Sequence, residues 1–69
     1  MTNEIIFLIS DSPEGGFEAR ALGHSIYTEA DSVDELREFV RDAVGVHFDD
    51  AERPGVIRLH FVREEVLAA

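Results

Sequence analysis

The amino-acid sequence predicts an α+β fold with the element order β-β-β-α-β. In this fold a three-stranded antiparallel meander is followed by one helix and by a fourth strand parallel to the first. Three observations predict it. Three short β-type segments near the start are separated by tight turns, a strongly capped amphipathic segment follows them, and a final short segment alternates apolar and polar residues. Sixty-nine residues suffice for one small domain, predicted as residues 1–69.

The first predicted strand, residues 4–10 (EIIFLIS), is apolar on both faces. Ile5, Phe7 and Ile9 lie on one face, Ile6 and Leu8 lie on the other, and residues 11–16 form a turn-rich stop. A strand of this kind is usually internal and covered on both sides. We therefore expect it in the middle of the sheet.

Two shorter strands are predicted next, at residues 17–22 and 25–30, joined by a tight turn at Gly23-His24. The first of them alternates only partly, so one of its faces is expected to be exposed to water. Short links between three consecutive strands predict an antiparallel meander.

The helix signal begins at Ser32, which stands three residues before Glu35 in the spacing of a capping box. An apolar stripe then recurs at helical spacing, and Arg37 and Arg41 are placed on the solvent side. The late Gly45 predicts fraying near residues 46–48. The stripe consists of Val33, Leu36, Val40, Ala43, Val44 and His47.

A polar loop at residues 49–55 ends the helix, and residues 56–62 alternate as a fourth strand. Ile57, Leu59 and Phe61 are predicted to face the core, whereas Arg58 and His60 face outward. Residues 63–69 are predicted either to dock as a last helical turn or to lie across the sheet. A right-handed crossover then gives the sheet order 3-2-1-4.

One helix cannot cover both faces of this sheet. We expect the second apolar face of the first strand to meet the tail or another subunit, so a homo-oligomer, with a dimer as first choice, is predicted. The longest apolar run, residues 5–9, is far too short to span a membrane, and there is no cysteine for a disulfide or thiolate site. We expect a cytoplasmic protein without a membrane partner.

The charge is strongly acidic. Fifteen acidic residues and six basic ones, all arginine, give a net charge of −9. This balance argues against direct binding of nucleic acid. Two interpretations stay open: an acidic face directed at a basic partner, or adaptation to a GC-rich genome or a salty host.

Three short motifs follow one another at a consistent spacing: an acidic Gly-Gly turn at residues 14–17 (EGGF), a turn at 21–24 (ALGH) and a helix start at 28–36 (TEADSVDEL). Over residues 4–48 they resemble the N-terminal domain of HicB-like antitoxins. That family often has proline, cysteine and glycine where Leu22, His24 and Ala30 stand here. The resemblance implies a lone single-domain relative without the family's DNA-binding segment, and a small basic RNA-cleaving toxin as its partner.

The family's fold is related to that of ribonuclease H, whose two-metal sites need several carboxylates at one end of the sheet. The first strand offers only Asp11 there, and the fourth offers Arg58 and His60. We therefore predict no enzyme, no catalytic, cofactor-binding or metal residue, and no cofactor. Solvated positions are predicted for Asp11, Glu14, Glu18 and Glu29 and for the helix-stop cluster His47, Asp49, Asp50 and Glu52.

The remaining candidates have structural explanations. His24 is interpreted as a turn residue, His60 as a surface or subunit-contact residue, and Phe17 and Tyr27 as core or interface. Two functions stay open. One is a non-catalytic interaction domain that neutralises a basic toxin; the other is a self-associating domain with a small-ligand or structural role and no toxin partner.

Overall fold

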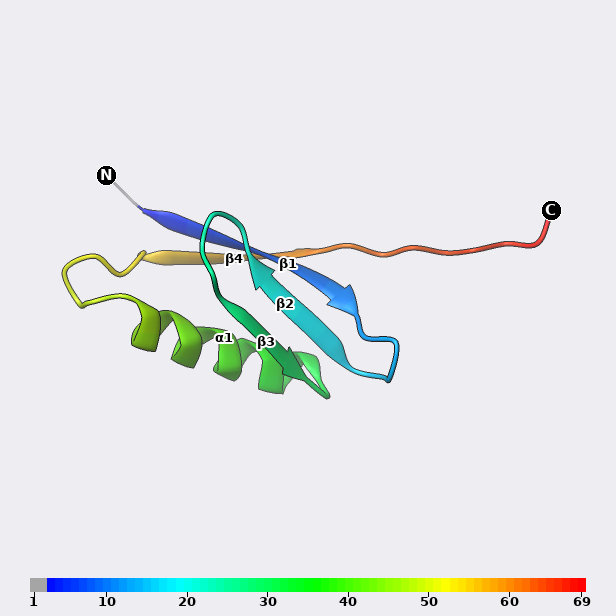
Figure 1. Cartoon of the computed structure of the whole chain (residues 1–69), viewed down its shortest axis with the longest axis horizontal. Helices are drawn as coiled ribbons and strands as arrows, with labels where there is room; N and C mark the ends of the chain where they lie inside the picture. The colour runs from blue at the N-terminus through cyan, green and yellow to red at the C-terminus, as the bar shows by residue number, and fades with distance from the viewer. Residues whose placement is uncertain (1–2) are drawn as a thin grey trace.

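The computed structural model describes residues 3–69; the predicted domain 1–69 therefore begins with two residues that lie outside this range. One four-stranded sheet carries one helix (Figure 1), which confirms the predicted fold class. Predicted strand ends differ from the observed ones by one or two residues. The elements are β1 (Glu4–Asp11), β2 (Phe17–Ala21), β3 (Tyr27–Ala30), α1 (Val33–His47) and β4 (Val56–Phe61).

The sheet has the predicted order β3-β2-β1-β4. β1 pairs antiparallel with β2, where Ile9 lies opposite Ala19, and parallel with β4, where Phe7 lies opposite Leu59. β2 pairs antiparallel with β3. The strand that is apolar on both faces thus occupies an inner position, as its composition predicts.

The core lies between α1 and the sheet face that α1 covers. Phe7 of β1 and Leu36 of α1 are fully buried, and no polar or charged residue is buried in the described part of the chain. Burial of apolar surface between these two layers supplies the main stabilisation of so small a domain. The buried residues are Ile5, Phe7, Ile9, Ala19, Ala21, Ile26, Ala30, Leu36, Val40 and Val44.

The capping signal places the start of α1 correctly. The Ser32 hydroxyl accepts a hydrogen bond from the Glu35 N–H at 3.2 Å, while the Glu35 carboxylate accepts one from the Asp31 N–H at 3.1 Å. These bonds satisfy donors that the first turn leaves free. At the other end the Phe48 N–H donates to the Val44 carbonyl at 3.1 Å. α1 ends at His47, within residues 46–48, where the sequence predicts the last turn to weaken.

The turn between β1 and β2 requires glycine at position 16. Gly16 has φ +83°, and a Cβ placed there would lie 2.5 Å from the Ala30 carbonyl oxygen. The Ser12 N–H closes the turn by donating to the Gly16 carbonyl at 3.0 Å. Gly16 therefore brings the turn close to the end of β3, a position that no side chain would allow.

β4 is less buried than the alternation predicts. Ile57 and Leu59 are only half-buried, and Phe61 is 51% exposed, so its assignment to the core is wrong. The reason lies in the placement of α1, which packs over β3 and β2 and leaves β4 uncovered on the same face (Figure 1). An alternating pattern identifies the face of a strand but not which part of the sheet a helix covers.

The C-terminal tail, residues 63–69, adopts neither predicted arrangement. It continues the direction of β4 and leaves the body of the molecule (Figure 1), whose longest dimension is 51 Å. Val66 is 92% exposed and Leu67 is 77% exposed. The second face of the sheet is therefore not covered by the tail. In the described part of the chain no helix is long and apolar enough to cross a bilayer.

Candidate interaction surface

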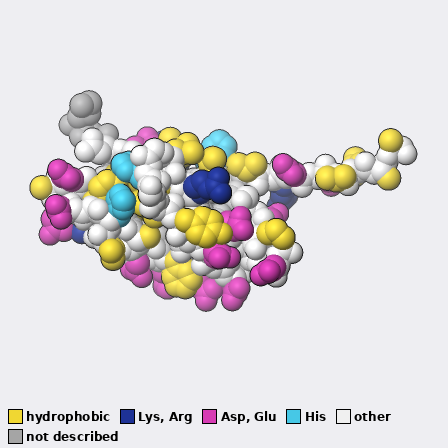
Figure 2. All heavy atoms as spheres, in the orientation of Figure 1, with side chains coloured by type: hydrophobic (Ala, Val, Ile, Leu, Met, Phe, Trp, Pro, Cys, Tyr) yellow, Lys and Arg dark blue, Asp and Glu magenta, His cyan; other side chains and the backbone are white. Residues whose placement is uncertain are grey.

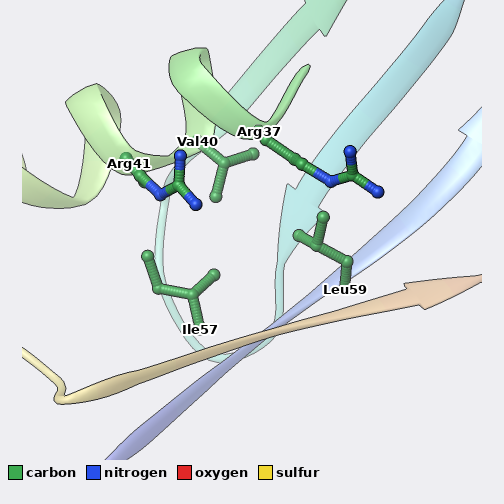
Figure 3. A pocket seen from close by; sticks show the side chains of 5 residues that line it. All are labelled: Arg37, Val40, Arg41, Ile57 and Leu59. Atoms are coloured by element: carbon green, nitrogen blue, oxygen red, sulfur yellow. The ribbon is translucent and has the colours of Figure 1, made fainter. Parts of the chain in front are cut away.

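The two arginines of helix α1 lie on one side of the helix, where Asp34 pairs with Arg37 at 3.0 Å. Arg37 and Arg41 lie beside β4, where they flank an opening between the helix and the strand (Figure 3). Successive residues are rotated by about 100° around a helix. Glu35 and Asp42 therefore project away from both the core and the two arginines, whereas Glu38 projects away from the core but lies only about 60° around the helix from Arg41. Both arginines are exposed, as the sequence predicts, but their placement next to β4 is not something the sequence indicated.

β3 is one of the two free edges of the sheet. The Ala21 N–H donates to the Ile26 carbonyl at 3.0 Å. Because hydrogen-bonded and non-bonded pairs alternate in an antiparallel ladder, Tyr27 and Glu29 direct their backbone N–H and C=O groups toward the free edge. A strand of another chain could form hydrogen bonds with these groups.

Acidic side chains surround this free strand. We define the acidic edge as Glu29 and Asp31 at β3 together with Glu35, Glu38 and Asp42 of α1, all of which are exposed. Figure 2 shows acidic side chains along the lower edge of the molecule, over α1, with few basic ones beside them. The edge thus combines a single sign of charge with an unpaired strand.

Two exposed aromatic side chains border the acidic edge. Tyr27 is 51% exposed on β3, and Phe39 is 40% exposed on the side of α1 that lies away from Arg37 and Arg41. Aromatic residues surrounded by polar residues are typical anchors in protein–protein interfaces. Their position favours a protein partner over a small ion.

Glu18 and Glu29 lie directly opposite each other on β2 and β3. Like charges in this arrangement destabilise a sheet, and they also act on the neighbouring Tyr27. Desolvation, followed by the charges of Glu18 and Glu29, raises the pKa of the Tyr27 hydroxyl above its usual value near 10.

A shallow hollow of about 210 Å³ lies on the sheet face opposite α1, beside Tyr27. Its wall carries Leu8 and Val62 as apolar groups and Glu18 and Arg20 as charges of opposite sign. Glu18, predicted to be solvated, is half-buried here. With both signs of charge on one open wall, the hollow selects neither an anion nor a cation.

On the same face of the sheet, Arg58 of β4 forms an ion pair with Glu4 of β1. The hydrogen bond from its guanidinium to the carboxylate raises the pKa of Arg58 above its already high value. Both side chains are accessible to water, so the pair contributes little to stability. It neutralises this end of the face, in contrast to the acidic edge.

The histidine candidates are brought together in part. The rings of His24 and His47 lie edge to face with centroids 5.8 Å apart, and each contacts the ring of Phe48. His47 is exposed, so its place in the apolar stripe is wrong; the stripe ends at Val44 because the sheet no longer covers the last turn. The contact between His24 and the end of α1 has no signal in the sequence, since 23 residues separate the two histidines.

The other candidates lie apart from one another. Asp11 and Glu14 are exposed beside the first turn, His60 is exposed on β4, and Phe17 packs against the core. In the helix-stop loop Asp50 pairs with Arg53 at 2.7 Å. Residues 3–69 contain no group of three side chains placed to hold a metal ion. The structure gathers these residues into no catalytic arrangement.

Two curated relatives match this chain. A UPF0150 protein of Archaeoglobus fulgidus is 54% identical over 50 residues, which cover 72% of this chain and 74% of the relative. A UPF0150 protein of Thermotoga maritima is 35% identical over 65 residues, covering 94% of this chain and 91% of the relative. The chain belongs to the UPF0150 family. No protein-family model matches it, and no solved structure gives a significant match.

The match within the UPF0150 family spans most of the fold. An alignment of 65 of the 69 residues includes the greater part of all four strands and the helix. The UPF0150 chain therefore shares its architecture with relatives from an archaeon and a bacterium. Its function has to be argued from the acidic edge and from the uncovered side of β4.

Proposed function

We propose that this UPF0150 chain is a non-catalytic interaction domain of the HicB-like kind, which binds and neutralises a small basic RNA-cleaving toxin. The observation that carries the proposal is the acidic edge: the unpaired strand β3, with exposed acidic residues on it and directly after it, packs against α1, whose outward side carries three more exposed acidic residues. The two arginines of α1 lie on the other side of the helix. The order of the EGGF, ALGH and TEADSVDEL motifs supports the family resemblance.

The acidic edge offers two kinds of recognition at once. The outward N–H and C=O groups of Tyr27 and Glu29 can pair with a strand of the partner. The main-chain hydrogen bonds formed in this way supply affinity. The carboxylates of Glu38 and Asp42 form ion pairs with lysine or arginine of the partner, which speeds encounter and rejects acidic proteins. Tyr27, on the sheet face opposite α1, and Phe39, on α1, provide exposed apolar contacts on the two sides of this edge.

A binding role is favoured over catalysis by the absence of a built site. Acid–base or metal chemistry depends on several side chains that converge in a protected pocket. Among residues 3–69 no polar or charged side chain is buried and no metal-ligand group forms. The net charge of −9 repels RNA and DNA, so neutralisation would act through the toxin and not through its substrate.

The direct test starts with a search for a short basic protein encoded next to this chain. RNA cleavage by that protein is measured alone and with one equivalent of the UPF0150 chain, and we expect inhibition at equimolar ratio. The variant Glu38→Arg/Asp42→Arg should lose inhibition, because it reverses two charges at the acidic edge. Glu14→Arg is the control, since Glu14 is exposed in the first turn, away from that edge. Unimpaired cleavage with the wild-type chain would contradict the proposal.

A second candidate function is a self-associating domain with a small-ligand or structural role. The half-buried residues Ile57 and Leu59 favour it, because they leave apolar surface along β4 uncovered. A genome without any basic protein encoded beside the chain would favour this alternative over the toxin partner. Purification of the tagged chain from its host, followed by mass spectrometry, distinguishes a stoichiometric basic protein from the chain alone.

A further inference from the structure

β4 is the second free edge of the sheet, and an apolar groove of about 210 Å³ lies between it and α1. Val40, Ile57 and Leu59 form its floor. In Figure 3 the side chains of Arg37 and Arg41 extend from the helix over the groove. The chain has a net charge of −9, and Arg37 pairs with Asp34 at 3.0 Å, so the positive charge of this rim is partly neutralised.

The backbone of β4 also has unpaired groups at this edge. The Val62 N–H donates to the Ile9 carbonyl at 2.8 Å, so residue 62 directs its backbone toward β1. Alternate residues of a strand face the same neighbour. Ile57, Leu59 and Phe61 therefore direct their N–H and C=O groups outward, where a further strand would pair with them.

The C-terminal tail has the composition that such a strand needs. Glu64 and Glu65 are followed by Val66 and Leu67, two highly exposed apolar residues. Because the tail continues straight on from β4 (Figure 1), it runs away from the groove of its own chain. Glu65 and Leu67 lie on the helix face of the extended strand, where the carboxylate complements the arginine rim and the leucine complements the floor. Glu64 and Val66 lie on the other face.

We propose that two copies of the chain pair β4 to β4 in antiparallel orientation, so that each tail becomes the next strand beside the other copy's β4. Val62 would lie on the two-fold axis, opposite Val62 of the second copy. The helix face would then place Glu65 opposite Leu59, below the Arg37 rim, and Leu67 opposite Ile57. On the other face Glu64 would lie opposite His60.

Charge selects this register among its neighbours. Moving the axis to Phe61 places Arg63 opposite Leu59, beneath Arg37, so that like charges meet. Moving it to His60 places Arg63 opposite Ile57, beneath Arg41, and leaves Leu67 beyond the groove. With the axis at Val62, each outward-facing residue of β4 meets an outward-facing residue of the tail, as an antiparallel ladder requires.

This interface is independent of the acidic edge. The proposed toxin contact uses β3 and the outer side of α1, whereas the dimer uses β4, at the opposite edge of the sheet. A dimer of this kind would join two sheets edge to edge and leave both acidic edges free. Failure of one proposal therefore does not imply failure of the other.

Cysteine cross-linking tests the register, because the chain contains no cysteine. In Val62→Cys the two introduced thiols would be directly opposite in a non-hydrogen-bonded pair, with Cα atoms about 4.5 Å apart, within disulfide reach. We expect a disulfide-linked dimer under mild oxidation. The control His60→Cys should remain uncross-linked, because its two thiols would be about 13 Å apart along the strands. A monomeric Val62→Cys chain, or equal cross-linking of His60→Cys, would overturn the proposal.

Sedimentation of two matched proline variants gives a second, non-covalent test. Residue 65 would donate its N–H to the second copy's Leu59, whereas residue 64 directs its N–H away from the interface. Glu65→Pro should weaken dimerisation about tenfold more than Glu64→Pro, although both remove the same charge. Equal dissociation constants would exclude this register, and a wild-type chain that sediments as a monomer at high micromolar concentration would exclude the dimer.

Discussion

Glu18 and Glu29 lie directly opposite each other on adjacent strands, and their charges add to desolvation in raising the pKa of Tyr27. A sheet that serves only its own stability would avoid this pair. It is explained if the β3 edge meets positive charge from another molecule. The repulsion between Glu18 and Glu29, which destabilises the free chain, would then also be relieved when a positively charged partner binds.

The titration of Tyr27 tests this relationship in the free chain. Because Tyr27 is the only tyrosine and there is no tryptophan, phenolate absorbance reports this residue alone. We expect its pKa above 10, shifted back toward 10 in Glu18→Gln. Because folding raises the pKa of Tyr27, the contribution of its neutral hydroxyl to the free energy of unfolding is fully present below pH 10. That contribution is lost as the pH rises through the folded pKa. An unchanged pKa in Glu18→Gln would contradict the electrostatic cause.

Leu36 anchors α1 on the sheet, and its truncation tests the core. Leu36 is fully buried, so Leu36→Ala should lower the free energy of unfolding by about 2–5 kcal/mol. This approaches the total stability expected of so small a domain. Val46→Ala is the matched control, because Val46 lies on the same helix and is 90% exposed. Similar urea midpoints for the two variants would show that α1 packs in another orientation.

Ser32 tests the start of the helix. Ser32→Ala removes the acceptor of the Glu35 N–H and should cost about 1 kcal/mol in chemical denaturation. Ser32→Asp keeps an acceptor at the same place and should stay close to the wild type. If the alanine and aspartate variants unfold alike, the cap contributes nothing and the helix begins elsewhere.

Substitution of glycine by alanine is predicted to have opposite effects at positions 16 and 45. Gly16→Ala should be strongly destabilising, because its backbone has positive φ and the new methyl group would collide with the Ala30 carbonyl. Gly45→Ala should stabilise by about 0.5–1 kcal/mol, because Gly45 lies in α1 with open space around it. Thermal unfolding of both variants checks the turn and the helix separately. A stable Gly16→Ala variant would contradict the close approach of the first turn to β3.

The strand order could be read from the sequence because the decisive signals are local. β1 is apolar on both faces, Ser32 and Glu35 begin the helix, and the short links leave few topologies. The lateral position of α1 could not be read in this way. Whether Leu36 and Val40 pack over β3 or over β4 depends on how the whole sheet twists and on which residues of β2 are small enough to receive the helix.

The sequence predicted that the molecule would have an acidic surface, but not where that surface would lie. The net charge predicted an acidic face. It did not predict that this face would lie at the β3 edge and on the outer side of α1, with Arg37 and Arg41 beside β4. The His24–His47 contact depends on a turn that meets the far end of α1. Such contacts join residues distant in sequence and follow from the three-dimensional packing, for which one sequence carries no periodic signal.

The proposed function depends above all on recognition of a basic protein by the acidic edge. The most direct measurement is the affinity for a short basic protein found encoded beside the chain, determined by calorimetry at several salt concentrations, for the wild type, Glu38→Gln/Asp42→Gln and the control Glu14→Gln/Glu52→Gln. Both variants lose two charges, so they differ only in position. The account predicts that binding weakens with salt, because exposed charges are screened beyond about 10 Å at 0.1 M, and that the edge variant binds about tenfold more weakly than the control. Equal affinities of the two variants, or a wild-type affinity that does not change with salt, would contradict it.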